Sequence, residues 1–220
     1  TYSQYAHEGF WQLLSVSMIN IVMILVCMQV FQKHKVLNGL LLVISLCTCV
    51  MTASAAYRMI LYVGAYGLTF LRILVLWFLV VLTLVMAGMM VAIFKEKFPL
   101  FQYGVAVLAC CYIVFSFVRV DAVIASYNIN NWETMRMTDV WYLMSLSEDA
   151  APYVAKIEPE MVSDLEENYG NWSDTSDENF LVAQKNQYFE YILQKDMSLR
   201  QWNYGILKAR ETAEDYFRGE

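Results

Sequence analysis

Four long runs of apolar residues constrain this chain more than any other feature. They cover about residues 10–31, 36–57, 71–94 and 100–118, and Arg72 is the one charged residue among them. In a helix that rises 1.5 Å per residue, each run is long enough to cross a hydrocarbon core of about 30 Å. A run of this kind can also be a buried core helix, but four in succession favour the membrane. We therefore predict an all-α, polytopic integral membrane protein with four transmembrane helices.

Charge divides the chain into two unlike parts. Residues 1–119 carry seven Lys/Arg and two Asp/Glu, a balance of +5, whereas residues 120–220 carry eight Lys/Arg and nineteen Asp/Glu, a balance of −11. We predict a transmembrane region over 1–119 and a small, soluble, acidic helical domain over 120–220. Because nucleic-acid binding depends on a basic surface, such an acidic domain is not expected to bind nucleic acid.

Two short basic turns suggest how the chain is oriented. Residues 32–35 and 95–99 separate successive apolar runs and together contain four lysines, whereas three arginines lie on the opposite side of the predicted spans. Cytoplasmic loops carry the excess of Lys and Arg. The turns are therefore expected to be cytoplasmic and the 120–220 domain extracytoplasmic.

Helical periodicity continues in the acidic half. After a break expected at Asn128, Asn130 and Asn131, one apolar face recurs at intervals of three and four residues and consists of Met137, Val140, Trp141 and Met144. Asp149 is expected to cap a short helix that has Pro152 in its first turn. Asp196 is expected to cap a last helix, whose apolar stripe is Leu199, Trp202, Ile206, Ala209, Ala213 and Tyr216.

Several segments occur in an order that is typical of one family. They are residues 5–14, 54–59, 66–69 with 71–72, 121–128 and 142–150. With them the chain resembles the bacterial polytopic membrane proteins of domain of unknown function 4173 and its relative 4153. The resemblance implies a bacterial cell membrane and further helices upstream of Thr1. It implies no activity.

One stretch, residues 54–72, gathers polar groups between two apolar runs. Ser54, Arg58 and Tyr62 follow one another at intervals of four, so they share a helix face. Gly64 and Gly67 then permit a break or a tight turn. An arginine near membrane depth is costly unless it is paired or reaches the interface.

The polar stretch is the candidate site of the chain. Tyr66 and Arg72 complete it, and Asp121 is expected on the same side of the membrane, where it can pair with the arginines. One interpretation is a polar pocket, an anionic-ligand or lipid-headgroup site, or a docking site for the acidic domain. The other is an interfacial anchor, with tyrosines in the aromatic belt and arginines on phosphates.

No pattern indicates catalysis or a cofactor. The histidines, His7 and His34, have no second histidine at ligand spacing. All five cysteines lie in apolar runs, where a thiol behaves as a small apolar side chain. The carboxylates of the tail lack the spacing of a calcium-binding loop and are interpreted as a solvated surface. We predict no catalytic residue, no metal and no cofactor.

The sequence therefore favours a non-catalytic membrane component. It would be a sensor, scaffold or complex subunit whose 120–220 domain contacts another membrane or envelope protein. A transporter or permease subunit with a polar site at residues 54–72 is the alternative. An enzyme of envelope lipids is a third possibility, disfavoured because no catalytic constellation is found.

Overall fold

The computed structural model describes residues 2–31, 34–95, 97–132, 137–158, 160–162, 178–195 and 204–219. This part of the chain forms helices, turns and loops with no strand, which confirms the all-α prediction. The chain divides into two compact units, called here the first and the second unit. The first comprises Thr1–Val63 and Leu71–Val118, and the second comprises Gly64–Phe70 and Arg119–Glu220.

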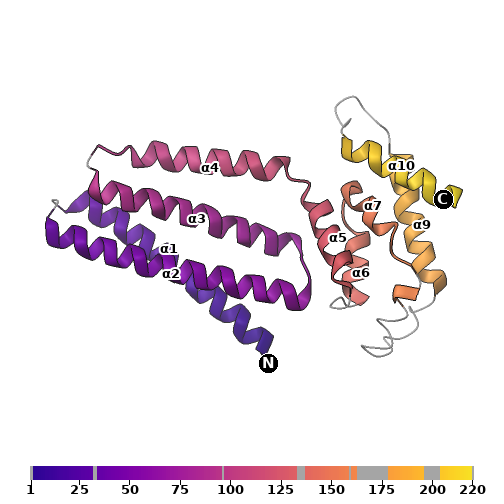
Figure 1. Cartoon of the computed structure of the whole chain (residues 1–220), viewed down its shortest axis with the longest axis horizontal. Coiled ribbons are helices and arrows are strands. Elements are labelled where there is room, and N and C mark those ends of the chain that lie inside the picture. The colour runs from indigo at the N-terminus through magenta and orange to yellow at the C-terminus, as the bar shows by residue number, and fades with distance from the viewer. Residues whose placement is uncertain are drawn as a thin grey trace. The chain divides into compact units, whose positions relative to one another are not determined.

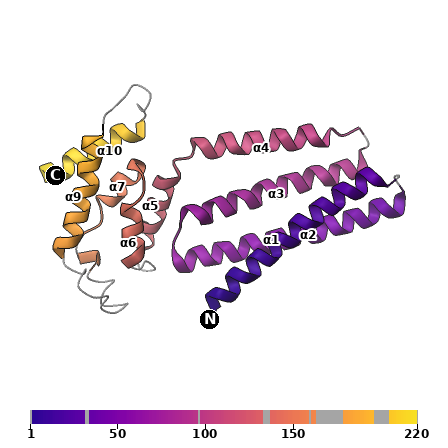
Figure 2. The same ribbon diagram turned by 180° about the vertical axis from the view of Figure 1, so that it is seen from behind.

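Four long helices make up most of the first unit. They are α1 (Tyr2–Val30), α2 (Lys35–Tyr66), α3 (Phe70–Phe94) and α4 (Leu100–Phe117). Successive helices run in opposite directions, as both views show (Figure 1, Figure 2). All four are long and apolar enough to cross a membrane, so the chain is a membrane-embedded protein.

Helix α2 extends further than the predicted span, which ended at Tyr57. It continues to Tyr66 because nothing after Arg58 breaks a helix, and Gly64 is tolerated within it. The break comes at Gly67, whose φ of 73° lies in the left-handed region that glycine adopts at little cost. The polar stretch is thus mostly helical.

Apolar side chains from three helices form the core of the first unit. Ile24 of α1 and Met86 and Met89 of α3 are fully buried within it. Two amides add interhelical hydrogen bonds: Asn20 Nδ2 donates to Thr48 Oγ1 at 3.0 Å, and Asn38 Nδ2 donates to the Ile93 carbonyl at 3.4 Å. Such bonds suit helix packing in lipid, where few other partners exist.

Helix α4 packs on α3 through a tyrosine and a glycine. Tyr103 lies against Gly88, where a Cβ would come within 2.1 Å of the ring, and its hydroxyl donates to the Leu84 carbonyl at 2.9 Å. Within this unit α4 buries none of its residues, and Phe101 is 84% exposed. An apolar helix surface of this kind suits contact with lipid.

Short helices make up the second unit, which includes the loop between α2 and α3. They are α5 (Val120–Asn130), α6 (Met137–Met144), η2 (Glu148–Ala150), α7 (Ala151–Val154), α9 (Glu178–Gln194) and α10 (Tyr204–Arg218). Its core contains Ile124, Leu143 and Phe189, all fully buried. Phe189 also stacks on Tyr216 of α10, with ring centroids 4.5 Å apart.

The predicted apolar face of α6 is found in part. Val140 is fully buried and Trp141 and Met144 are half-buried, whereas Leu143, which the pattern omitted, is fully buried. The side chain of Met137 lies outside the described residues.

One predicted helix boundary in the second unit is confirmed and one is wrong. The break expected at Asn128, Asn130 and Asn131 is found at its end, since α5 runs to Asn130 and Asn131 is its C-cap, whereas Asn128 stays within the helix with its side chain buried and bonded. Asp149 lies inside η2, whose N-cap is Ser147, and so does not cap the helix that follows. Pro152 is in the first turn of α7, as predicted.

The apolar stripe of the last helix is borne out where the structure describes it. Ala209 and Ala213 are fully buried, and Ile206 and Tyr216 are half-buried. The other residues of the prediction, Asp196, Leu199 and Trp202, lie outside the described residues.

Candidate functional site

The polar stretch places four of its candidate residues on one helix. Ser54, Arg58 and Tyr62 lie on α2 and Tyr66 is its last residue; Arg58 is exposed and Ser54 is half-buried. Arg72, in the first turn of α3, holds its guanidinium 4.7 Å from the centroid of the Tyr62 ring. This is a cation–π contact, and it keeps the charge of Arg72 beside an aromatic face rather than alone in an apolar setting.

Two of the candidate residues, Tyr66 and Asp121, belong to the second unit. Asp121 Oδ2 accepts a hydrogen bond from the Ser147 amide at 3.1 Å. Since Arg58 and Arg72 belong to the first unit, their predicted pairing with Asp121 stays a prediction.

The loop between α2 and α3 is held by side chains of the second unit. Asn128 of α5 uses both ends of its amide: Oδ1 accepts from the Leu68 N–H at 2.7 Å, and Nδ2 donates to the Leu68 carbonyl at 2.9 Å. Tyr142 Oη accepts the N–H of Phe70, the first residue of α3, at 3.0 Å. We call the Asn128–Leu68 and Tyr142–Phe70 contacts the loop clamp.

The loop clamp leaves no room for a larger residue at its turn. A Cβ on Gly67 would lie 3.0 Å from Asn128 Oδ1, and Asn128 itself is only 2% exposed. The buried amide of Asn128 needs its hydrogen-bond partners on Leu68. Glycine at position 67 leaves the space in which that amide lies.

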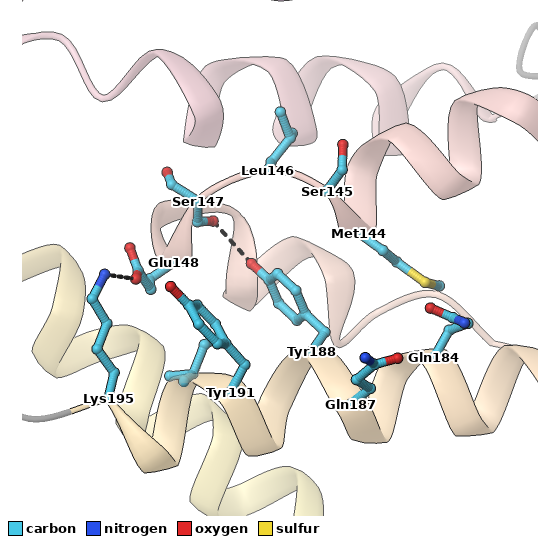
Figure 3. Close-up of a pocket in the computed structure, with 11 residues that line it drawn as sticks. Met144, Ser145, Leu146, Ser147, Glu148, Gln184, Gln187, Tyr188, Tyr191 and Lys195 are labelled. Carbon is cyan, nitrogen blue, oxygen red and sulfur yellow. Dashed lines mark hydrogen bonds and ion pairs between the residues drawn. The ribbon is translucent and has the colours of Figure 1, made fainter.

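An open cleft of about 670 Å³ lies in the second unit between α9 and the chain from α6 to η2. Figure 3 shows Tyr188 and Tyr191 extending from α9 toward that chain. The lining residues are Met144, Ser145, Leu146, Ser147, Glu148, Gln184, Gln187, Tyr188, Tyr191, Ile192 and Lys195.

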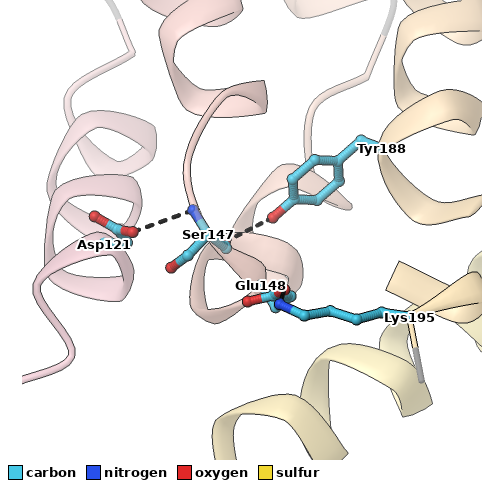
Figure 4. A network of polar contacts seen from close by, with 5 residues as sticks. All are labelled: Asp121, Ser147, Glu148, Tyr188 and Lys195. Carbon is cyan, nitrogen blue, oxygen red and sulfur yellow. Dashed lines mark hydrogen bonds and ion pairs between the residues drawn. The ribbon is translucent and has the colours of Figure 1, made fainter. Parts of the chain in front are cut away.

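Hydrogen bonds fix one end of the cleft. Ser147 is held from two sides, because its amide donates to Asp121 and its carbonyl accepts from the Tyr188 hydroxyl at 2.9 Å (Figure 4). Next to it, Lys195, the first residue after α9, forms an ion pair with Glu148 of η2. These contacts tie α5, η2 and α9 together at this end of the cleft.

Charge around this end of the cleft shifts several pKa values. Burial opposes ionisation of Glu148, but the hydrogen bond and charge of Lys195 outweigh it and hold the Glu148 pKa below its usual value. The hydrogen bond to Glu148 raises the pKa of Lys195. Burial raises the pKa of Asp149, and although Arg119 opposes this, the nearby carboxylates Asp121 and Glu148 add to it.

Tyr188 serves this site as a hydrogen-bond donor. Burial raises its phenol pKa well above the usual range, and Glu148, Asp121 and Asp149 raise it further. A phenol that stays protonated at neutral pH is a poor general base. In the described residues no three His, Cys, Asp or Glu side chains lie together as a metal ion would need.

A lysine is buried behind the cleft. Lys185 of α9 is 7% exposed and donates to the carbonyls of Ala155 and Ile157 at 3.2 and 2.7 Å. Burial lowers its pKa, an effect that Glu158 opposes. Because its polar atoms face the turn after α7, Lys185 joins α9 to that turn.

Sequence reasoning did not single out the residues that form the loop clamp and the cleft. Asn128 was interpreted as part of a break, and no pattern marked Tyr188 or Lys195. The segment 142–150, one of those that carry the family resemblance, supplies Tyr142, Ser147 and Glu148.

The comparisons with known proteins identify a family. The model of the family "Domain of unknown function (DUF4153)" matches residues 1–157, which include α1 to α7 and the loop clamp, whereas α9 and α10 lie beyond the match. No curated protein and no solved structure matches the chain. The match is to the second of the two related families that the sequence resembles, and the resemblance to family 4173 stays a prediction. The chain belongs to the DUF4153 family.

Proposed function

We propose that this protein is a non-catalytic component of the bacterial cell membrane, a sensor, scaffold or subunit of a membrane complex. Its second unit is the part that binds a partner, another membrane or envelope protein. On this proposal the turns at 32–35 and 95–99 face the cytoplasm and the second unit is extracytoplasmic.

The loop clamp is the observation that carries the proposal. Leu68 and Phe70 belong to a loop that is covalently continuous with α2 and α3, yet their amides are bonded to Asn128 and Tyr142. Separating the Asn128 amide from Leu68 would leave the N–H and the carbonyl of Leu68 unpaired, at a cost of about 1–3 kcal/mol for each group. A partner that alters the second unit would therefore also act on the loop between two transmembrane helices.

The polar chemistry of the second unit supports binding rather than catalysis. The titratable groups near the cleft are used within the fold: Glu148 pairs with Lys195, and Tyr188 donates to a carbonyl. A transporter would instead need polar groups that face a path through the helices. In the described spans, the amide of Asn20 is bonded to Thr48, as in helix packing.

In-cell photo-crosslinking tests the proposal. A photoreactive residue is placed in the full-length chain at exposed positions of the second unit that do not line the cleft: Lys156, Glu160, Ala183 and Lys208. Val80, exposed on α3, gives the control position. We expect one or more of the four to give a discrete protein adduct that Val80 does not give. If all four positions give none, the proposed function is wrong.

A further inference from the structure

The helical wall of the cleft is long enough to lie along a short extended peptide. One wall is a single face of α9, on which Gln184, Gln187 and Tyr191 follow at intervals of three and four residues, and Lys195, the first residue after the helix, continues the series. The eleven residues from Gln184 to the end of α9 at Gln194 span about 16 Å at 1.5 Å each. An extended chain rises about 3.3 Å per residue, so about five residues of peptide match this length.

The lining can hold a peptide backbone without fixing its sequence. Gln184 and Gln187 each present an amide with donors and an acceptor. The same unit contains an example of a side-chain amide that binds peptide backbone, since Asn128 forms hydrogen bonds with both the N–H and the carbonyl of Leu68. Met144, which is half-buried, supplies apolar surface for a side chain of the peptide.

One end of the cleft carries an excess of negative charge. Three carboxylates, those of Asp121, Glu148 and Asp149, lie close enough to Tyr188 to act on its ionisation. Two cations oppose them, with Lys195 on Glu148 and Arg119 3.8 Å from Asp149. The whole of residues 120–220 carries eight basic and nineteen acidic residues, so its field adds to this local excess.

We propose that the cleft between α9 and the 144–148 turn binds an extended segment of a partner protein, about five residues long, with a basic side chain at the Glu148 end. This rests on the proposed function and names the chemistry of the partner. The Glu148 carboxylate can accept further hydrogen bonds beside the one from Lys195. Electrostatic attraction to the Glu148 end makes the cleft specific for a basic side chain, and the side-chain amides of α9 fix the position of the peptide along the helix.

Tyr191 is the residue that a bound peptide would cover. It lines the cleft but is 61% exposed, in contrast to Tyr188, which is 9% exposed and bonded to Ser147. Exposed tyrosines that become buried on binding are common anchors at interfaces. Its removal should weaken binding while the fold is kept.

Fluorescence anisotropy with the full-length chain in detergent tests the inference. The probe is a labelled, end-capped pentapeptide of alternating alanine and lysine, and the matched probe has glutamate in place of lysine. We expect the lysine peptide to bind at least tenfold more tightly, and added salt to weaken it. Tyr191→Ala should weaken its binding about tenfold or more, and Gln187→Ala several-fold. Val182→Ala, an exposed position of α9 outside the lining, should change nothing.

Equal binding of the two peptides, or lysine-peptide binding that Tyr191→Ala leaves unchanged, would overturn the inference. The second result would mean that the peptide is attracted to the acidic surface in general. The peptide assay and the crosslinking assay can fail independently of each other. If the off-cleft positions give crosslinks but the peptide does not bind, the second unit binds its partner elsewhere. If the peptide binds but no position gives a crosslink, the proposed cellular role is wrong.

Discussion

The side-chain amide of Asn128 forms both backbone hydrogen bonds of Leu68, a residue sixty positions earlier in the chain. The pairing is the one that an adjacent strand would make, with one donor and one acceptor on each partner. Through it, the loop between α2 and α3 belongs to the second unit. The loop is therefore fixed by residues of the tail and not only by the ends of its own helices.

Replacing Asn128 should release the loop. Asn128→Leu keeps the side-chain size but leaves the buried N–H and carbonyl of Leu68 unpaired, which costs about 1–3 kcal/mol for each group. We expect a lower unfolding midpoint of the second unit in detergent, followed by near-UV circular dichroism. The matched control is Asn130→Ala, an exposed position two residues later in α5. Equal effects of the two substitutions would contradict the account.

Two glycines of the same stretch should respond in opposite ways. Gly67→Ala requires a left-handed residue to carry a Cβ 3.0 Å from Asn128 Oδ1, so it should destabilise the second unit by about 1 kcal/mol or more. Gly64 is helical and a Cβ there meets nothing within 4 Å. Gly64→Ala should be neutral or stabilising by up to about 1 kcal/mol. Thermal melts of the two variants in one detergent make the comparison, and a loss at Gly64 as large as at Gly67 would refute it.

The close contact between Gly88 of α3 and Tyr103 of α4 should make Gly88→Ala destabilising. Gly88→Ala places a Cβ within 2.1 Å of the Tyr103 ring, so the helices must separate or the ring must move, at a cost of about 1–3 kcal/mol. Gly104→Ala, on α4, meets nothing within 4 Å and is the control. Resistance of the folded protein to SDS measures the difference. In the double variant Gly88→Ala with Tyr103→Ala, the ring that the added Cβ would meet is gone, so Gly88→Ala should cause no further loss of SDS resistance there. If Gly88→Ala behaves like Gly104→Ala, this packing is wrong.

The Glu148–Lys195 ion pair predicts a dependence on pH. The folded pKa of Glu148 is lowered, so its contribution is present above the unfolded value and is lost as pH falls through the folded one. The folded pKa of Lys195 is raised, so its contribution is present below the unfolded value and is lost as pH rises through the folded one. The pair should therefore stabilise the fold at neutral pH, by about 1 kcal/mol because it is partly solvated.

The matched variant for this pair is Lys195→Met. The free energy of unfolding is measured against pH for the parent and for this variant, and one curve is subtracted from the other. The subtraction removes the contribution of Asp149, whose pKa is raised by burial and by its acidic neighbours and which therefore acts in the opposite direction to Glu148. The difference should be largest near neutral pH and should shrink toward acid. A difference that stays constant from pH 3 to pH 8 would mean that the ion pair contributes nothing.

The sequence predicts those features of the fold that depend on neighbours along the chain. Four apolar runs sufficed for four membrane helices, and periodicity found Val140 and Ala209 in the core. Three asparagines indicated the break that follows α5, but the role of Asn128 within the helix was missed because its partner, Leu68, is in no local pattern. The cleft was missed for the same reason, since Glu148 and Lys195 meet only after the fold has formed.

Hydrogen exchange at the amide of Leu68 shows whether Asn128 holds the loop between α2 and α3. It is measured on the full-length chain in detergent, for the parent protein and for Asn128→Leu. The account predicts that the amides of Leu68 and Phe70 are protected in the parent, and that the protection of Leu68 is lost in Asn128→Leu while the amides of the α3 interior stay protected. If in the parent the Leu68 amide exchanges as fast as an open loop, the loop is not held by the second unit and the account is wrong.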